Sequence, residues 1–426
     1  MKWRVVKLDE IKSPEKGALV SGPFGSNIGS RFFVATGVPV IRGNNLSMGQ
    51  KRFIDDGFVF ITEDKARELR NCNARSDDII FTAAGTLGQV GLMPKIGRFD
   101  SYIISNKQIR LRLDTNQAFP LFAYYFLSSP DMRAFIASQN KGSSVPLLTL
   151  GIIRNLKIPL PPITTQKRIV AILSAYDELI ENNQRRIALL EKMAEEIYRE
   201  WFVRLRFPGH EKVKMVKGVP EGWEVRTLAS IASEIKRGIK KKNLADAERY
   251  LGLEHIPRRS ISIKEWATAS TVESDKLLFQ DRDILFGKIR PYLHKVALAH
   301  FSGACSSDTI VLRPKEKFYE GYLLFTIFSD TFIELATIAS KGTKMPRADW
   351  GFLKQLELAI PDAKLLKVFQ TKFELLFSQI VNLLRANEVL TASRDLLLPR
   401  LISGKLSVEH LDIQFPPGME ESVHDI

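Results

Sequence analysis

The chain has 426 residues, of which 45% are hydrophobic and 26% charged, the balance of a globular protein of two or three domains. This composition excludes a disordered tail, a collagen-like fibre and a disulfide-stapled miniprotein. Lys and Arg number 62 against 48 Asp and Glu, so the net charge is +14, which favours an acidic polymer as partner, nucleic acid before membrane.

Two cysteines and the absence of long apolar runs point to the cytoplasm. Cys72 and Cys305 are too few for a disulfide framework or a cysteine-rich zinc site, so we expect a reducing compartment. The first ten residues hold no apolar run typical of a signal peptide. No run of 18 apolar residues occurs, so we expect no membrane span.

Residues 1–160 are predicted to form a mixed domain. Short β-rich runs at 38–41, 78–81 and 108–113 lie between turns of Gly, Asn and Ser. A short helix is expected near 121–127. A second mixed domain is predicted over 208–362, opened by Val219-Pro220-Glu221-Gly222-Trp223.

A long helix is predicted after each mixed domain, over 161–207 and 363–406. Apolar residues alternate by four and three from Ile169 to Ile197 and again from Phe369 to Leu401, a pattern typical of coiled coils. Each seam contains one Asn, Asn183 and Asn387, which we predict to set register. The spacing leaves open whether the helices pair with each other, parallel or antiparallel, or with a partner. Residues 407–426 form an acidic, Pro-containing tail.

The second half of the chain repeats the first. The segment 142–146 (GSSVP) recurs as 342–346 (GTKMP), and 155–161 is matched by 355–361. Upstream, 78–81 (DIIF) recurs as 283–286 (DILF) at a slightly larger offset. This collinear series indicates two divergent copies of one unit of about 200 residues.

Motifs of common catalytic and cofactor sites are absent from the sequence. It contains no G-x-x-x-x-G-K-[ST] phosphate loop, no H-E-x-x-H and no His/Cys zinc spacing. The run 85–91 (GTLGQVG) lacks the dinucleotide spacing and predicts a strand–turn–strand. Neither Pro-Pro pair has the context of an adenine methyltransferase motif, and 361–364 (PDAK) is only superficially like a nuclease element.

The order of mixed domain, helix, mixed domain, helix resembles the specificity subunit of Type I restriction–modification enzymes. Residues 158–162 (IPLPP) and 166–170 (QKRIV) resemble the start of that family's first conserved region, and 400–406 (RLISGKL) the end of its second. The segments 78–81 and 85–88 resemble a core hairpin of its recognition domains, and the loop at 142–144 fits as well. The second copy departs from the pattern, since 366–370 (LKVFQ) stands where the first has QKRIV.

The resemblance implies an α+β fold of two mixed α/β target recognition domains, each followed by a coiled-coil helix, with the two helices pairing antiparallel as a ruler. It implies a non-catalytic chain that reads a bipartite, asymmetric double-stranded DNA site. Two methyltransferase subunits and a restriction subunit would be its partners. S-adenosylmethionine, ATP and Mg would bind to those subunits, and this chain would hold no cofactor or metal.

Basic and amide side chains gather on predicted turns of both mixed domains. Arg suits guanine edges and Asn or Gln adenine edges, whereas Lys more often holds phosphates. From turn position and side-chain chemistry we predict DNA contact by Arg42, Asn44, Asn45, Gln89 and Ser144 in the first domain, and by Lys241, Lys288, Arg290 and Lys344 in the second. Lys241 and Lys344 are assigned to phosphate.

Two other functions stay open at this point. The chain could be a stand-alone DNA-modifying enzyme such as a metal-dependent nuclease, which activity of the purified chain with Mg²⁺ or S-adenosylmethionine alone would support. It could instead be a coiled-coil scaffold without sequence reading, which weak, salt-insensitive DNA binding would support.

Overall fold

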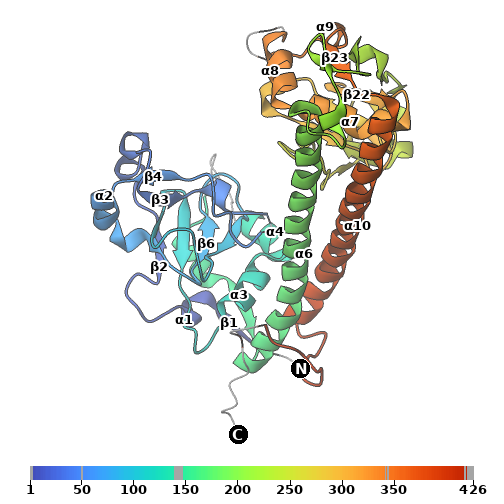
Figure 1. The fold of residues 1–426 in the computed structure, drawn as a ribbon. Coiled ribbons are helices and arrows are strands. Elements are labelled where there is room, and N and C mark those ends of the chain that lie inside the picture. Colours follow the sequence, from blue (N-terminus) through green and yellow to red (C-terminus); the bar gives the residue numbers. More distant parts are fainter. Residues whose placement is uncertain are drawn as a thin grey trace. The chain divides into compact units, whose positions relative to one another are not determined.

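The computed structural model describes residues 3–48, 51–138, 147–340, 342, 345–416 and 419. The chain divides into two compact units, one of Met1–Leu179 with Leu390–Ile426 (unit 1), the other of Ile180–Val389 (unit 2). Each unit holds one mixed domain and part of both long helices, α6 (Ile163–Tyr198) and α10 (Ala363–Ile402) (Figure 1). The predicted mixture of helix and sheet in two domains is confirmed.

The mixed domain of unit 1 contains two four-stranded sheets. One has the order β2 (Leu19–Ser21), β9 (Gln108–Leu111), β6 (Ile79–Thr82), β7 (Val90–Leu92), all antiparallel. The other has the order β4 (Val59–Ile61), β3 (Val38–Ile41), β8 (Tyr102–Ile104), β5 (Asn73–Ala74), with β3 and β8 parallel. Strands β3 and β6 are buried on both faces, which explains their continuous apolar runs.

Short helices surround these sheets. They are α1 (Leu8–Ile11), α2 (Glu63–Glu68), α3 (Pro120–Leu127), α4 (Pro130–Ser138) and α5 (Leu150–Asn155). Helix α3, which confirms the helix predicted near 121–127, begins with a proline at its first turn, where no amide donor is needed. Strand β1 (Arg4–Lys7) pairs with β10 (Lys157–Leu160) and so brings the start of the domain to the junction with α6.

The mixed domain of unit 2 has the same plan. One sheet has the order β14 (Ala232–Glu234), β22 (Thr309–Pro314), β19 (Ile284–Gly287), β20 (Val296–Leu298); the other has β15 (Gly238–Ile239), β18 (Lys276–Phe279), β21 (Gly303–Cys305), β16 (Arg249–Leu251), β17 (Ala267–Thr268). Strand β13 (Glu224–Thr227) pairs with β23 (Glu357–Ile360), and β11 (Met215–Val216) with β12 (Val219–Pro220). The helices are α7 (Glu320–Phe328), α8 (Asp330–Ile338) and α9 (Trp350–Leu353).

The internal repeat predicted from the sequence is visible in this topology. The order β2-β9-β6-β7 becomes β14-β22-β19-β20, and the parallel pair β3–β8 becomes β16–β21. The added strand in unit 2 is β15. The segments 142–146 and 342–346 lie mostly outside the described residues, so that match cannot be followed in space.

An ion pair made by a buried aspartate explains why DIIF and DILF recur. Asp78 accepts two hydrogen bonds from the guanidinium of Arg112, at 2.8 Å each, and one from a turn amide at 2.9 Å. Asp283 does the same with Arg313, at 2.7 and 2.9 Å, and with a turn amide at 2.7 Å. Each pair joins a strand of the hairpin to its neighbour, so the aspartate is part of the fold rather than of a catalytic site.

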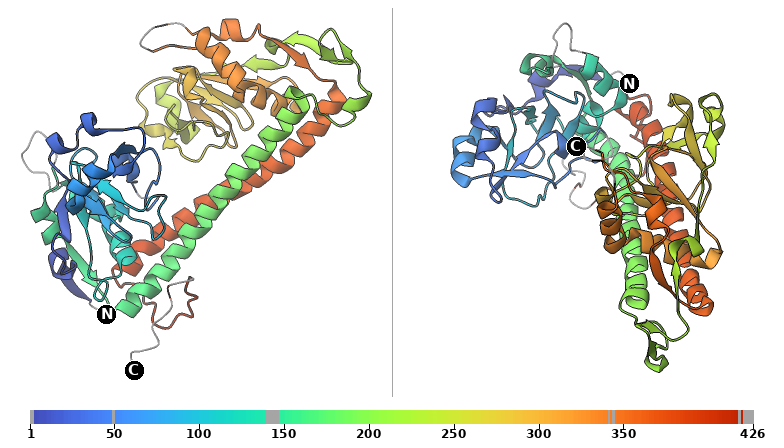
Figure 2. Two further views of the ribbon diagram at one scale, coloured as in Figure 1. Left: turned by 60° about the vertical axis from the view of Figure 1, so that its left-hand side comes forward. Right: turned by 90° about the horizontal axis from the view of Figure 1, so that it is seen from above.

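The two long helices lie side by side within each unit (Figures 1 and 2). In unit 2 the Asn183 amide donates to Asn387 Oδ1 at 2.9 Å, so the two predicted seam asparagines meet. In unit 1 Arg394 donates to Asp177 at 2.8 Å. Helix α6 passes into a π-helical turn at Arg199–Val203, within the predicted span.

Candidate nucleic-acid interface

The turn after β3 carries three of the predicted contacts, and they divide by burial. Arg42 and Asn44 are exposed. Asn45 is fully buried, because its amide donates to the carbonyls of Ile54 and Asp56 (3.0 and 2.8 Å) and its oxygen accepts the backbone N–H of Arg42 (2.9 Å). The prediction that Asn45 contacts DNA is therefore wrong. Its side chain forms three hydrogen bonds inside the protein and so stabilises the turn that carries Arg42 and Asn44.

Gln89 ties the neighbouring hairpin to the same turn. Its oxygen accepts from the Thr82 hydroxyl at 2.9 Å, and its amide donates to the carbonyl of Leu46 at 3.1 Å. The side chain is half-buried, and a contact with DNA stays a prediction. Two other predicted contacts, Ser144 and Lys344, lie outside the described residues.

Both predicted lysines of unit 2 have partners within the chain. Lys241 is ion-paired with Glu273 in an exposed setting, and the adjacent Lys240 with Asp275 at 2.8 Å. Lys288 is half-buried and donates to the carbonyl of Ser307 at 2.7 Å. A phosphate would have to replace these partners.

Arg290 differs from them. It lies in the hairpin loop between β19 and β20, where its backbone N–H donates to the carbonyl of Pro346 at 2.8 Å. The side chain is exposed and forms no hydrogen bond or ion pair with any residue that the structure describes. Its φ of +50° is in the left-handed region, and Tyr292, two residues on, is 54% exposed. Among the described cations of the predicted set in unit 2, Arg290 therefore differs from Lys241 and Lys288 in having no partner within the chain.

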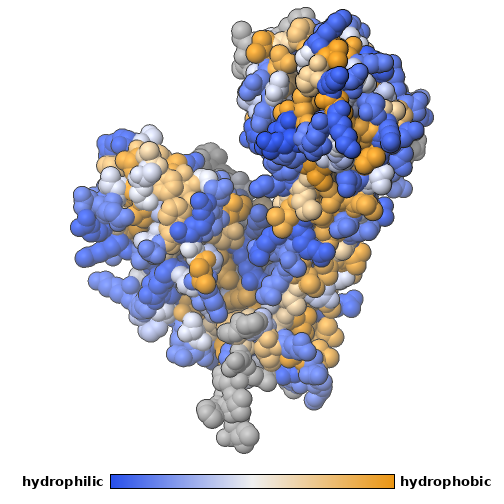
Figure 3. All heavy atoms as spheres, in the orientation of Figure 1, coloured by the Kyte–Doolittle hydropathy of each residue, from blue (hydrophilic) through white to orange (hydrophobic). Residues whose placement is uncertain are grey.

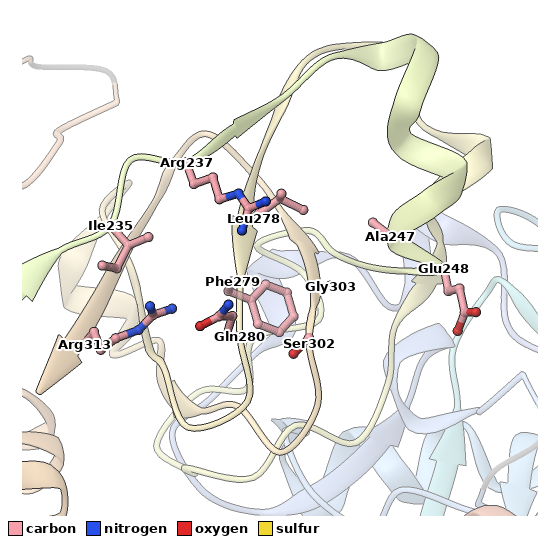
Figure 4. Close-up of a pocket in the computed structure, with 10 residues that line it drawn as sticks. All are labelled: Ile235, Arg237, Ala247, Glu248, Leu278, Phe279, Gln280, Ser302, Gly303 and Arg313. Carbon is pink, nitrogen blue, oxygen red and sulfur yellow. The ribbon is translucent and has the colours of Figure 1, made fainter. Parts of the chain in front are cut away.

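A shallow pocket of about 360 Å³ in unit 2 adds residues that the sequence analysis did not select (Figure 4). Its lining includes Arg237, Arg313, Gln280 and Ser302 beside the ring of Phe279. Arg313 is held by Asp283, whereas Arg237 is exposed and unpaired among the described residues. In the sequence, the run of basic residues around Arg237 is the one feature that points to this pocket. A rim of guanidinium groups suits phosphate contact, and the buried Phe279 ring offers no stacking face.

Arg52, which belongs to a basic cluster in the sequence, faces inward. Its guanidinium lies 3.0 Å from the Tyr125 hydroxyl and 3.2 Å from Asp177 Oδ2, and the same carboxylate accepts from Tyr125 (2.6 Å) and Arg394. Burial raises the pKa of Tyr125 well above its usual value, which keeps the hydroxyl a donor to Asp177. The cluster joins the mixed domain of unit 1 to α6 and α10.

The exposed surface of the long helices is partly apolar. On the parts of α6 and α10 that belong to unit 2, the large apolar side chains exposed by at least 44% are Leu189, Met193, Val368, Leu375 and Val389. Figure 3 shows hydrophobic side chains along the visible helices among hydrophilic ones. Of the exposed side chains, Leu189 and Met193 lie one helical turn apart on the same face of α6 and offer an apolar surface to another protein.

Other classes of site are not found in the part of the chain that the structure describes. No group of three or more His, Cys, Asp or Glu there could hold a metal ion. Within the same residues no single helix is long and apolar enough to cross a membrane; one bent helix pair, Lys317–Phe328 with Asp330–Ile338, passes by length and composition.

Comparison with known proteins agrees with this arrangement. The family described as Type I restriction modification DNA specificity domain matches residues 2–192 and again 220–384. The MjaIX specificity subunit of a Type I restriction enzyme of Methanocaldococcus jannaschii is 24% identical over 96% of this chain and 94% of its own. The MjaVIII specificity subunit of the same organism is 23% identical over 73% and 76%. The crystal structure of a Type I S subunit from M. genitalium, 17% identical, shares the fold with a TM-score of 0.55 over 94% and 96% of the two chains.

A duplicated mixed domain carried on two long helices, with cationic loops, defines a DNA-recognition protein. The chain belongs to the Type I restriction modification DNA specificity family and contains two copies of its domain. Its function is the recognition of DNA sequence.

Proposed function

We propose that this chain is the non-catalytic recognition subunit of a Type I restriction–modification enzyme and that its two domains read the two unlike halves of a bipartite DNA site. The observation that carries the proposal is the duplication. Both units have the same strand order apart from the added β15 of unit 2, but their exposed loops differ in sequence, with Gly85 in one where Arg290 stands in the other. Because each mismatched base pair costs about 1–3 kcal/mol, two different domains in one chain multiply their discrimination.

We further propose that α6 and α10 form an antiparallel coiled coil that sets the spacing of the two half-sites. The support comes from inside each unit. In unit 1, Asp177 in the first half of α6 contacts Arg394 near the end of α10. In unit 2, Phe202 in the π-helical turn after α6 lies beside Phe369 near the start of α10, with the ring centroids 4.9 Å apart. A helix of 36 residues rises about 54 Å at 1.5 Å per residue, the scale of a rigid spacer along DNA.

The exposed apolar residues of α6 and α10 in unit 2 support docking of methyltransferase subunits, two by the symmetry of the repeat, with a restriction subunit joining them. S-adenosylmethionine, ATP and Mg are proposed to act on those subunits, not on this chain. The complex is proposed to work in the cytoplasm, where its DNA is.

Two measurements on purified protein test this function. Co-expression with the methyltransferase subunit of the host should yield a stable complex whose DNA affinity falls steeply with salt, because phosphate contacts release counterions. Cleavage or methylation by the chain alone would favour a stand-alone enzyme. A flat salt dependence of the complex would favour a scaffold that does not read DNA.

A further inference from the structure

The hairpin loops β6–β7 in unit 1 and β19–β20 in unit 2 are built on one backbone plan. One backbone hydrogen bond closes each loop. A second joins the loop to the turn before the neighbouring strand of the sheet, β9 or β22, and a third joins it to the segment before the last short helix of the domain, α5 or α9. These bonds are Thr82 N–Gln89 O, Ala83 N–Lys107 O and Leu148 N–Ala83 O in unit 1, and Gly287 N–Lys295 O, Lys288 N–Asp308 O and Ala348 N–Lys288 O in unit 2. All six lie between 2.7 and 3.1 Å.

Both loops also enter the left-handed region twice, but with different residues. Unit 1 does so at Gly85 (φ +107°) and Gly88 (φ +90°), and unit 2 at Arg290 (φ +50°) and His294 (φ +52°). Glycine adopts this conformation freely, whereas a residue with a Cβ is strained in it. Unit 2 therefore retains two strained residues where unit 1 shows that glycine serves the same loop.

Packing offsets the strain at His294, although both ring nitrogens lack a hydrogen-bond partner among the described residues. Its side chain is 3% exposed, and its ring lies 4.7 Å from the ring of Phe328 at the end of α7. Asp330 of α8 lies 3.6 Å from Nδ1. In unit 1 a Cβ on Gly88 would lie 3.3 Å from the carbonyl oxygen of Arg133, so that loop has little room for such an anchor. His294 thus holds the loop against the helices behind it.

The strain at Arg290 has no such compensation. Its side chain is exposed and has no partner among the described residues, and a Cβ built at the matching Gly85 meets nothing within 4 Å. Strained residues persist where a ligand or a reaction uses them. Lys217 shows that a left-handed residue can be exposed without a ligand where a two-residue hairpin turn requires positive φ. Arg290 lies in a longer loop, so an interaction outside the chain is the favoured explanation of its strain.

We infer that Arg290 is a specificity-determining residue of the second recognition domain and that its guanidinium reads a guanine in the second half-site. This rests on the proposed function. Arg suits the task because its planar fork donates to guanine O6 and N7 together. The matching position of the first domain is Gly85, which has no side chain to offer a base, so the two half-sites differ at the corresponding base pair.

The variant Arg290→Gly separates function from stability, because glycine relieves the strain and removes the guanidinium. The control is Lys217→Gly: Lys217 is also exposed and left-handed (φ +51°), but lies in the turn between β11 and β12. Each variant should raise the melting temperature of the full chain, by about 2–4 °C. In selection of random duplexes by the complex with methyltransferase subunits, Arg290→Gly alone should lose preference for one G·C pair of one half-site, by about 10- to 100-fold.

The outcomes distinguish the inference from the function on which it rests. If the wild-type complex enriches a bipartite motif and Arg290→Gly enriches the same one equally, the inference is wrong and the function stands. A uniform loss of affinity at every sequence, or full rescue of the motif by Arg290→Lys, would show a phosphate contact and also overturn base reading. If the wild-type complex enriches no motif, both fail.

Discussion

Asp78 and Asp283 show how single buried charges hold the repeat together. Each carboxylate is about 1% exposed and is held by an arginine and a turn amide. Removal of the Asp78 charge would also leave the guanidinium of Arg110, which is 3% exposed and lies 3.9 Å away, without its carboxylate partner. Breaking such a pair from one side typically costs about 3–5 kcal/mol. We expect Asp78→Asn to lower the urea midpoint of unfolding strongly. The matched control is Asp64→Asn, since Asp64 is 88% exposed and its pair with Arg67 contributes little.

His300 makes the stability of unit 2 dependent on pH. Its side chain is 8% exposed, and its ring nitrogens have no partner among the described residues. Burial, and then the nearby Arg249 and Arg385, lower the pKa of His300 to about 4. Because this lies below the ordinary value, the unfolded chain takes up the proton first, and stability is lost as pH falls from about 6.5 toward 4.

The expected loss between pH 7 and pH 5 is on the order of 2 kcal/mol. Urea unfolding of the wild type and of His300→Phe at both pH values measures it, since the carboxylates titrate alike in the two proteins. Equal pH dependence of the two would show that His300 is already protonated, or hydrated, in the folded chain.

At the scale of secondary-structure elements, the Asn183–Asn387 hydrogen bond is the polar feature of an apolar helix seam. Replacing Asn387 by Leu leaves the buried amide of Asn183 unpaired, which costs about 1–3 kcal/mol, whereas the half-buried Asn387 left by Asn183→Leu should cost less. Replacing both should be nearly neutral or stabilising, at the expense of register. A double-mutant cycle by thermal unfolding measures this coupling, with Asn182→Leu, an exposed neighbour, as control. Additive effects would contradict a role for the pair.

The elements also show what the sequence could predict. The heptad positions are buried or half-buried along both helices, because helical periodicity alone decides which face is covered. The burial of Asn45 and the inward orientation of Arg52 could not be predicted from the sequence, because burial of a turn side chain depends on segments that are distant in sequence. Gln370 makes the same point: it accepts from Gly321 N at 2.9 Å, much as Gln166 accepts from Phe119 N at 2.7 Å, although it stands one helical turn further along. The second helix therefore keeps a similar glutamine contact, which the sequence comparison missed because the glutamine is displaced by one helical turn.

At the scale of the whole molecule, the chain carries two recognition domains that share a fold but differ in their exposed side chains. The repeat, the long helices and the family were all predictable from the sequence because they depend on collinear patterns. The bases to be read were not, because they depend on a few exposed side chains such as Arg290.

The most direct test is to map DNA methylation in the source cell by single-molecule sequencing, with the gene intact and deleted. If the two domains read the two half-sites, deletion abolishes adenine methylation at one bipartite motif whose two halves differ and whose spacing is fixed. Methylation that is unchanged by the deletion in a cell with active methyltransferase subunits, or lost at a motif with only one recognised half, would contradict reading by two domains.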